Sequence, residues 1–198
     1  MNLIVPTLPC LLLLSIVASF GCSRGQRPTV ETTASPKNDP TPAAASAPSE
    51  ATPPPAIAAW MDRLTVPHFY DPATGFIVAR EPTPLPPILA DAPPLDRAIA
   101  EAGDQRLVVV FVTADRCAPC QQYKLDALND ATVITRLSEP RFLPTHLEVD
   151  RAPELADAHL GSRGIPMTYA LRDGTIVATL RGQRSASELL AWIDALPE

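Results

Sequence analysis

The sequence predicts an α/β domain, in which helices flank a mixed central sheet, over about residues 95–198. Three observations lead to this prediction. Residues 107–112, LVVVFV, form an unbroken β-branched and aromatic run, as expected of a strand buried on both faces. Stretches with helical periodicity lie on both sides of this run. The pair Asp173-Gly174 separates two further apolar runs, which indicates a β-hairpin.

The first half of this domain contains several predicted helices around the central strand. Over residues 95–102, apolar residues recur at i, i+3, i+4 and i+7, and Gly103 ends the pattern. Residues 117–130 predict a second helix, where Pro119 is tolerated because amides of the first turn need no intrahelical partner. A shorter helix follows from Asp130. We expect the second helix to pack through Tyr123, Leu125 and Leu128.

The second half of the domain continues with alternating strands and helices. Gly161 ends one helix, and Ser185 with Glu188 forms a capping-box pattern at the start of the last one. The complete predicted order is α-β-α-β-α-β-β-α. The elements of this half are a strand at 145–149, a helix at 153–160, strands at 167–171 and 176–180, and a terminal helix after Ser185.

Residues 1–21 have the composition of a secretion signal that is removed from the mature chain. Their apolar core is followed by small residues and is short for a permanent membrane span. The segment ASFGC that ends at Cys22 resembles a bacterial lipobox, in which the cysteine becomes the lipidated first residue. We therefore expect Cys22 to hold the protein on the periplasmic side of a bacterial membrane. Ordinary secretion with Cys22 incidental, or an uncleaved anchor, are the alternatives.

Two segments of unusual composition separate this signal from the α/β domain. Residues 22–59 are rich in Pro, Ala and Thr and contain too little apolar surface to offset the entropy of ordering. They predict a disordered tether. Residues 60–94 contain more aromatic and aliphatic side chains, but also many prolines. We expect an irregular segment with one short strand near Gly75 to Ala79, packed against the domain.

The cysteines indicate where the chemistry lies. Cys10 would leave with the signal and Cys22 would carry lipid, so Cys117 and Cys120 would be the only remaining thiols. Cys117 stands between a buried strand and the positive end of a helix, where a thiolate is stabilised. Two cysteines at this spacing predict thiol–disulfide exchange, with Cys117 as the nucleophile and Cys120 as the resolving thiol.

These residues resemble the thioredoxin family. The segment TADRCAPC, residues 113–120, is similar to the corresponding part of the carboxy-terminal domain of the disulfide reductase DsbD. A second segment, RGIPMT at 163–168, resembles the loop in which thioredoxins carry a cis-proline facing the cysteine pair. The resemblance covers about residues 95–198 and implies a thioredoxin-like fold. It also implies a substrate groove that includes Pro166, Ile165 and Arg116.

The chain departs from the family pattern at two positions. Arg116 stands where thioredoxins usually have Trp, and we expect its charge to favour the Cys117 thiolate. Phe111 stands where the family buries an Asp that helps to move a proton from the resolving cysteine. His146, on the neighbouring strand, is a candidate proton relay in its place; the alternative is an ordinary, half-exposed strand residue. We expect Asp115 and Glu148 to be solvated charges.

The sequence thus predicts a monomeric, membrane-anchored thiol–disulfide oxidoreductase, similar to protein-disulfide reductases, that acts on protein thiols or disulfides of the cell envelope. No cofactor is expected, and a membrane electron donor is a candidate partner. One alternative is a redox-inactive binding module of the same fold. Another is a copper or zinc carrier that would use the cysteine pair with His68, His146 or His159. The net charge of −6 and the lack of basic runs argue against nucleic-acid binding.

Overall fold

A computed structural model describes residues 52–198 of the chain. Its central feature is a four-stranded sheet with the strand order β4-β3-β5-β6. β3 is parallel to β4 and antiparallel to β5, so the sheet is mixed, as predicted. The strands are β3 (Leu107–Thr113), β4 (Phe142–Glu148), β5 (Met167–Arg172) and β6 (Thr175–Arg181). The predicted signal, Cys22 and most of the predicted tether lie outside the described residues.

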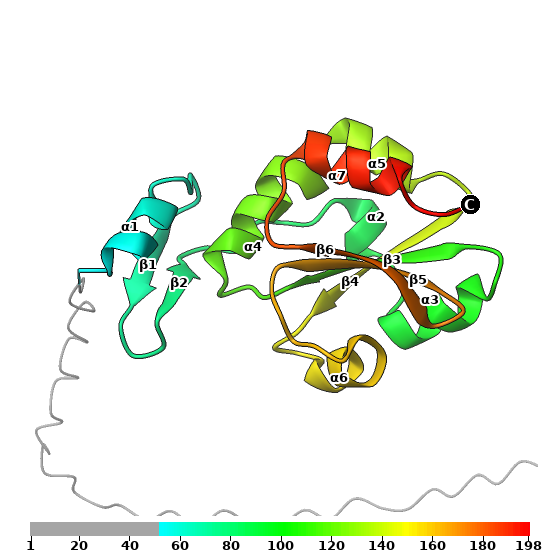
Figure 1. Ribbon diagram of the computed structural model, residues 1–198, viewed down its shortest axis with the longest axis horizontal. Coiled ribbons are helices and arrows are strands. Elements are labelled where there is room, and N and C mark those ends of the chain that lie inside the picture. Colours follow the sequence, from blue (N-terminus) through cyan, green and yellow to red (C-terminus); the bar gives the residue numbers. More distant parts are fainter. Residues whose placement is uncertain (1–51) are drawn as a thin grey trace, which may run out of the picture. The chain divides into compact units, whose positions relative to one another are not determined.

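Helices cover both faces of this sheet (Figure 1). One face carries α3 (Leu95–Ala102) and α6 (Pro153–Leu160). The other face carries α4 (Ala118–Tyr123), α5 (Ala131–Leu137) and α7 (Ala186–Asp194). All residues of β3 are buried, and successive side chains point to opposite faces. Val108, Val110 and Val112 therefore enter the first core, and Leu107, Val109 and Phe111 enter the second.

Local signals set the ends of several elements. Gly103 follows α3 with φ of 54°, a conformation that glycine adopts without a steric penalty. Asp130 caps α5, because its side chain accepts hydrogen bonds from the Thr132 and Val133 amides. Ser185 and Glu188 form the predicted capping box at the start of α7. Asp173 and Gly174 both have positive φ and form the turn between β5 and β6.

Two local predictions were wrong. The cysteine helix does not continue as a regular α-helix, because Lys124–Leu128 form a π-helical segment, η1. This change alters which side chains share a face, and Leu125 is 50% exposed instead of packed. β4 begins at Phe142 and not at Thr145, so it includes Pro144. Proline is tolerated there because β4 is an edge strand, paired with β3 alone.

The segment before the domain contains more regular structure than its composition suggests. It forms α1 (Pro55–Met61), β1 (His68–Asp71), β2 (Phe76–Ala79) and α2 (Pro87–Ala90). The tether was predicted to extend to residue 59, but α1 begins at Pro55, where proline favours the first helical turn. β2 was predicted, but β1 was not. The two strands pair antiparallel around a turn in which the Asp71 carboxylate accepts from the Ala73 amide.

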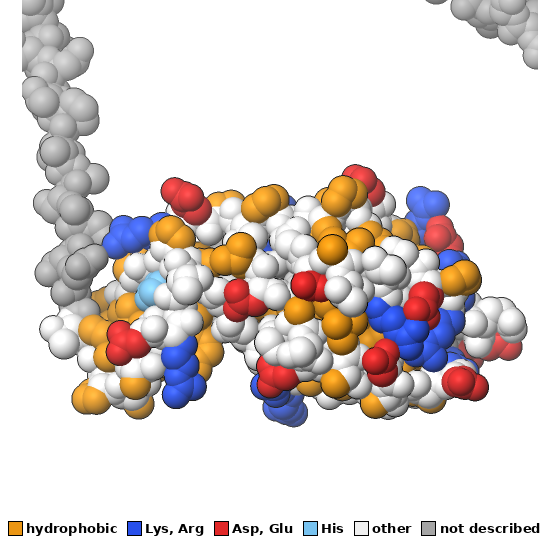
Figure 2. Space-filling model, turned by 90° about the horizontal axis from the view of Figure 1, so that it is seen from above, with side chains coloured by type: hydrophobic (Ala, Val, Ile, Leu, Met, Phe, Trp, Pro, Cys, Tyr) orange, Lys and Arg blue, Asp and Glu red, His pale blue; other side chains and the backbone are white. Residues whose placement is uncertain are grey.

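Hydrogen bonds fasten this segment to the domain along its length. The Thr65 and Val66 amides donate to Gln122, at 2.7 and 3.1 Å. Further along, Thr145 Oγ1 donates to the Pro93 carbonyl oxygen at 2.6 Å. In Figure 2 the part with α1, β1 and β2 is the narrower lobe at the left. None of the helices between residues 52 and 198 has the length and hydrophobicity of a membrane span.

Candidate active site

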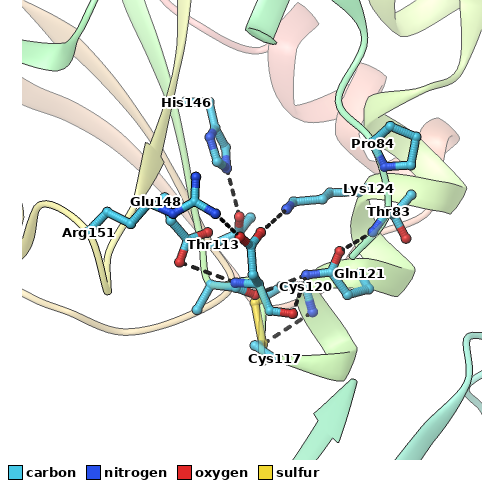
Figure 3. Close-up of polar contacts among 12 residues, drawn as sticks. Thr83, Pro84, Thr113, Cys117, Cys120, Gln121, Lys124, His146, Glu148 and Arg151 are labelled. Atoms are coloured by element: carbon cyan, nitrogen blue, oxygen red, sulfur yellow. Dashed lines mark hydrogen bonds and ion pairs between the residues drawn. A yellow bond between two sulfur atoms is a disulfide. The ribbon is translucent and has the colours of Figure 1, made fainter. Parts of the chain in front are cut away.

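The two cysteines lie where β3 ends and α4 begins. Cys117 is the N-cap residue of α4, and its Sγ accepts a hydrogen bond from the Cys120 amide at 3.2 Å. The two sulfur atoms form a disulfide, and the Cα atoms lie 5.2 Å apart (Figure 3). Cys117 keeps 9% of its surface exposed, whereas Cys120 is fully buried. Of the two sulfur atoms, only that of Cys117 is therefore accessible from the surface.

A groove of about 440 Å³ opens beside Cys117. Its lining includes Ile165 and Arg116, as expected from the resemblance. The Ile165–Pro166 peptide bond is cis. Pro166 itself is buried and does not line the groove, and its carbonyl oxygen accepts from the Gly182 amide at 2.9 Å. The groove therefore lies between the sulfur of Cys117 and the residue that precedes the cis-proline.

Arg116 has a different role from the one its position beside Cys117 suggests. Its guanidinium donates to both carboxylate oxygens of Asp150, at 2.7 and 2.9 Å. This hydrogen bonding raises the pKa of Arg116 and lowers the pKa of Asp150. Since the opposite charge lies in direct contact, little of the Arg116 field remains to stabilise a thiolate at Cys117.

Behind the cysteine loop, a cluster of charged side chains converges on Asp115. Lys124, only 2% exposed, places its Nζ 3.4 Å from one carboxylate oxygen of Asp115, and Arg151 pairs with the other. Figure 3 shows Lys124 and Arg151 approaching from opposite sides. The Asp115 amide also donates to Glu148 at 3.2 Å. Asp115 and Glu148 were expected to be solvated charges. The side chain of Asp115 is 38% exposed, so it is partly solvated as well as paired, whereas Glu148 has a buried carboxylate oxygen and does not fit the expectation.

Two members of this region have shifted proton affinities. Burial, reinforced by the charge of Lys124, lowers the pKa of His146 to about 4, so its ring is neutral at pH 7. Burial likewise raises the pKa of Glu148, with Asp115 adding to the effect. The second carboxylate oxygen of Glu148 is buried and has no protein partner. Both side chains line a cavity of about 500 Å³, together with Asp115, Lys124 and Arg151.

Two adjacent glutamines hold the site together, and sequence reasoning missed them. Gln121, fully buried, donates to the carbonyl oxygens of Ala114 and Asp115, both at 3.0 Å. Its own oxygen accepts from the Thr83 amide at 2.6 Å. Gln122, also buried, binds the segment before β1 as described above. The only sequence signal for this role was weak. It consisted of two amide side chains in the first turns of a helix that was expected to pack against the sheet.

The histidines do not gather around the cysteines. The ring of His68 is hydrogen-bonded through Nδ1 to the Val66 carbonyl oxygen at 2.7 Å. His146 is bonded through Nε2 to Thr113 Oγ1, also at 2.7 Å, and His159 lies in the last turn of α6. In the part of the chain that the structure describes, no three His, Cys, Asp or Glu side chains form a group that could hold a metal ion.

Comparison with known proteins yields one family and several similar structures. A family model described as a thioredoxin-like domain matches residues 94–197, which include the disulfide and the cis peptide. No curated protein sequence matches the chain. A thioredoxin from Thermus thermophilus is 30% identical, with 51% of this chain and 82% of that one aligned and a TM-score of 0.44.

Two further solved structures are similar to the chain. A point mutant of the thioredoxin from Halobacterium salinarum is 24% identical, with 54% of this chain and 88% of that one aligned and a TM-score of 0.43. The thioredoxin of Fasciola hepatica is 25% identical, with 50% and 88% aligned and a TM-score of 0.41.

Proposed function

The chain belongs to the thioredoxin-like family, and on this premise we propose that it is a thiol–disulfide oxidoreductase acting on proteins. The observation that carries the proposal is the asymmetry of the cysteine pair. Cys117 opens onto a groove beside the cis Ile165–Pro166 bond, while its bonded partner Cys120 is fully buried. Exchange needs one accessible attacking thiolate and one nearby resolving thiol, and this arrangement provides both.

The exchange steps follow from this asymmetry. In a reduction, the Cys117 thiolate attacks one sulfur of a substrate disulfide, and the other substrate sulfur leaves as a thiolate and takes up a proton. Cys120 then loses its proton and attacks Cys117 Sγ, which breaks the bond to the substrate. Two electrons have passed to the substrate, and the protein is left with the Cys117–Cys120 disulfide. The same steps in reverse oxidise a substrate dithiol.

The buried thiol of Cys120 needs a proton acceptor, and Phe111 cannot serve as one. We assign this role to the cavity that contains His146 and Glu148. Glu148 is the stronger acceptor, because its pKa is raised and one of its carboxylate oxygens is buried without a protein partner. His146 is neutral at pH 7, but its pKa of about 4 makes it the weaker base. His146 bonds to Thr113 and not to Cys120, and Cys120 does not line the cavity, so the proton would have to reach it through at least one water molecule.

The proposal predicts that the purified full-length chain accelerates the reduction of insulin by dithiothreitol, and that Cys117→Ser abolishes this activity. Cys120→Ser should instead stop the reaction at the mixed disulfide, because Cys117 can attack but the bond cannot be resolved. Electrophoresis without reductant would detect the trapped adduct, and its disappearance in Cys117→Ser is the matched control. If the wild-type chain adds nothing to dithiothreitol and Cys120→Ser traps nothing, the chain is a redox-inactive binding module.

We also propose that the enzyme acts in the cell envelope, anchored by a lipid on Cys22 and supplied with electrons by a membrane donor. The support is the signal-like composition of residues 1–21 and the lipobox-like segment that ends at Cys22. Acyl chains contribute about 0.8 kcal/mol per buried CH₂, so several of them hold a protein on a bilayer without a membrane span.

The anchor predicts that the expressed full-length protein sediments with membranes and is released from them by Cys22→Ser. Mass spectrometry of the wild-type protein should find an acylated Cys22 as its first residue. Cys10→Ser serves as the control, because that cysteine would be removed with the signal. An unmodified Cys22, or a Cys22→Ser protein that still sediments with membranes, would contradict the anchor.

A further inference from the structure

The groove beside Cys117 has walls from two distant parts of the chain. One wall is the loop of Arg163, Gly164 and Ile165, within the range that the family model matches. The other wall comes from α1 and the β1–β2 hairpin, which precede that range. This second wall consists of Ile57, Gly75, Phe76 and Ile77. The chain therefore adds its own surface to the site at which a substrate would meet Cys117.

The hairpin is fixed to the cysteine loop through its backbone. Val78 forms an isolated antiparallel bridge with Cys117, and the Ala79 amide donates to the Arg116 carbonyl oxygen at 2.9 Å. Behind the hairpin, Leu64 and Val66 pack on Ala118 of α4 in a small apolar cluster. These contacts set the distance between the hairpin and the reactive sulfur, so the second wall is a preorganised part of the groove.

The interior of the groove is apolar. Phe76, at the start of β2, is 55% exposed, which makes it the most exposed large apolar side chain among residues 52–198. The two charged residues of the lining are Arg116 and Arg163, and each is paired with a carboxylate, Asp150 and Asp157 respectively. The lining therefore offers no unbalanced charge, and it favours an uncharged, apolar occupant.

We propose that this groove binds a bulky apolar side chain next to the cysteine of the substrate, and that Phe76 determines this preference. The inference rests on the proposed function, since it identifies the class of substrate for the same site. The occupant must carry a sulfur that reaches Cys117, which itself lines the groove. One extended residue spans only about 3.3–3.6 Å, so the side chain in the groove belongs to a residue within one or two positions of the substrate cysteine.

Two peptide disulfides test the inference. Each is a dimer of a short peptide joined through its single cysteine, with two Leu residues on each side of the cysteine in one peptide and two Ser residues on each side in the other. The full-length protein, previously reduced, transfers two electrons to the dimer, releases two peptide thiols and forms the Cys117–Cys120 disulfide. We expect the second-order rate constant of the Leu peptide to be roughly tenfold higher than that of the Ser peptide.

Phe76→Ser should reduce this ratio to about two or less, whereas Phe76→Leu should keep most of it. The matched control is Leu125→Ser, which removes an apolar side chain of similar exposure outside the groove and should leave the ratio unchanged. In the adduct of the Leu peptide with Cys120→Ser, nuclear Overhauser effects should link the Leu methyl groups to the Phe76 ring.

The outcomes separate this inference from the proposed function. If the wild-type protein reduces both peptides at the same rate, exchange stands and the apolar subsite does not exist. A ratio that survives Phe76→Ser overturns the role of Phe76. If neither peptide is reduced and no adduct forms, the proposed function fails, and this inference fails with it.

Discussion

Phe111→Asp is expected to lower the free energy of unfolding by about 5 kcal/mol at pH 7, from the lost aromatic burial and the buried carboxyl group. Phe111 is fully buried in β3, and its ring centroid lies 6.4 Å from that of Tyr123. The surrounding cluster is formed by apolar side chains of α4, α5 and α7. A carboxylate at this position would be enclosed by this apolar cluster, so its neutral form would be favoured. Urea denaturation at several pH values would measure the effect.

The pH dependence of the stability of Phe111→Asp separates the effect of the carboxylate charge from that of the lost packing. The pKa of the new carboxyl should be higher in the folded than in the unfolded protein, because burial disfavours ionisation. Stability relative to Phe111→Asn should therefore be equal below about pH 4 and then fall by about 1.4 kcal/mol per pH unit up to the folded pKa. Phe111→Leu should lose less than about 1.5 kcal/mol. If the Asp and Asn variants are equally stable at all pH values, water reaches this position.

Local patterns predicted most of the domain because each depends on neighbours in the sequence. The apolar spacing of α3, the seven buried residues of β3 and the Asp173-Gly174 turn are short-range signals. The capping box of α7 is another. The errors arose where the position of a strand in the sheet, or a change of helix type, outweighed the local sequence signal. Pro144 enters β4 because that strand has one free edge, and Leu125 is exposed because the helix widens into a π-helical segment.

The N-terminal hairpin could not be predicted in full because its stability comes from distant contacts. β1 has four residues, and an isolated two-stranded hairpin is marginally stable in water. Here it is held by Gln122, which lies 57 residues beyond Thr65, and by the backbone of Arg116 and Cys117. A turn signal was present, since Asp71 and Gly75 flank the loop, but prolines before and after the hairpin argued against regular structure.

The residues of the candidate site were likewise predicted only where the signal was local or implied by the resemblance. Cys117 and Cys120 were evident from spacing, and the cis peptide before Pro166 was implied by resemblance. The charge balance of Arg116 was not evident, because Asp150 lies 34 residues away. The contribution of Phe76 to the groove was not evident either, because it depends on the fold of a segment that precedes the family match.

Phe111 stands where thioredoxins usually bury an Asp, so the ionisable groups of this chain lie away from the centre of the sheet. The position on β3 beneath the cysteines is apolar, and the charges gather instead at the end of β3, on β4 and on η1. Asp115, Lys124, Glu148 and Arg151 form this cluster, and His146 lies beside it with a pKa lowered to about 4. It therefore offers the most direct test of the electrostatics behind the active site.

The stability of the protein should fall by about 2 kcal/mol between pH 7 and pH 5 because of His146 alone. Its pKa is lowered from 6.5 to about 4, first by burial and then by Lys124. The unfolded chain therefore binds a proton below pH 6.5 that the folded protein does not bind until about pH 4. Stability is retained above pH 6.5 and is lost as the pH falls through this window. Urea denaturation of the wild-type protein and His146→Gln at both pH values would measure it.

The comparison with His146→Gln is needed because Glu148, which lines the same cavity, also contributes to the pH dependence. Glu148 has a raised pKa, so its contribution has the opposite sign: it favours the folded protein at low pH. Since Glu148 is present in both proteins, the difference between them isolates His146. The amide of the new side chain can still bond to Thr113, which keeps the packing similar.

His159→Gln, which changes a histidine outside the cluster, should retain the acid sensitivity of the wild type. Equal losses of stability in the wild-type protein and His146→Gln would mean that the folded protein protonates His146 as readily as the unfolded chain, and the lowered pKa of His146 would be overturned.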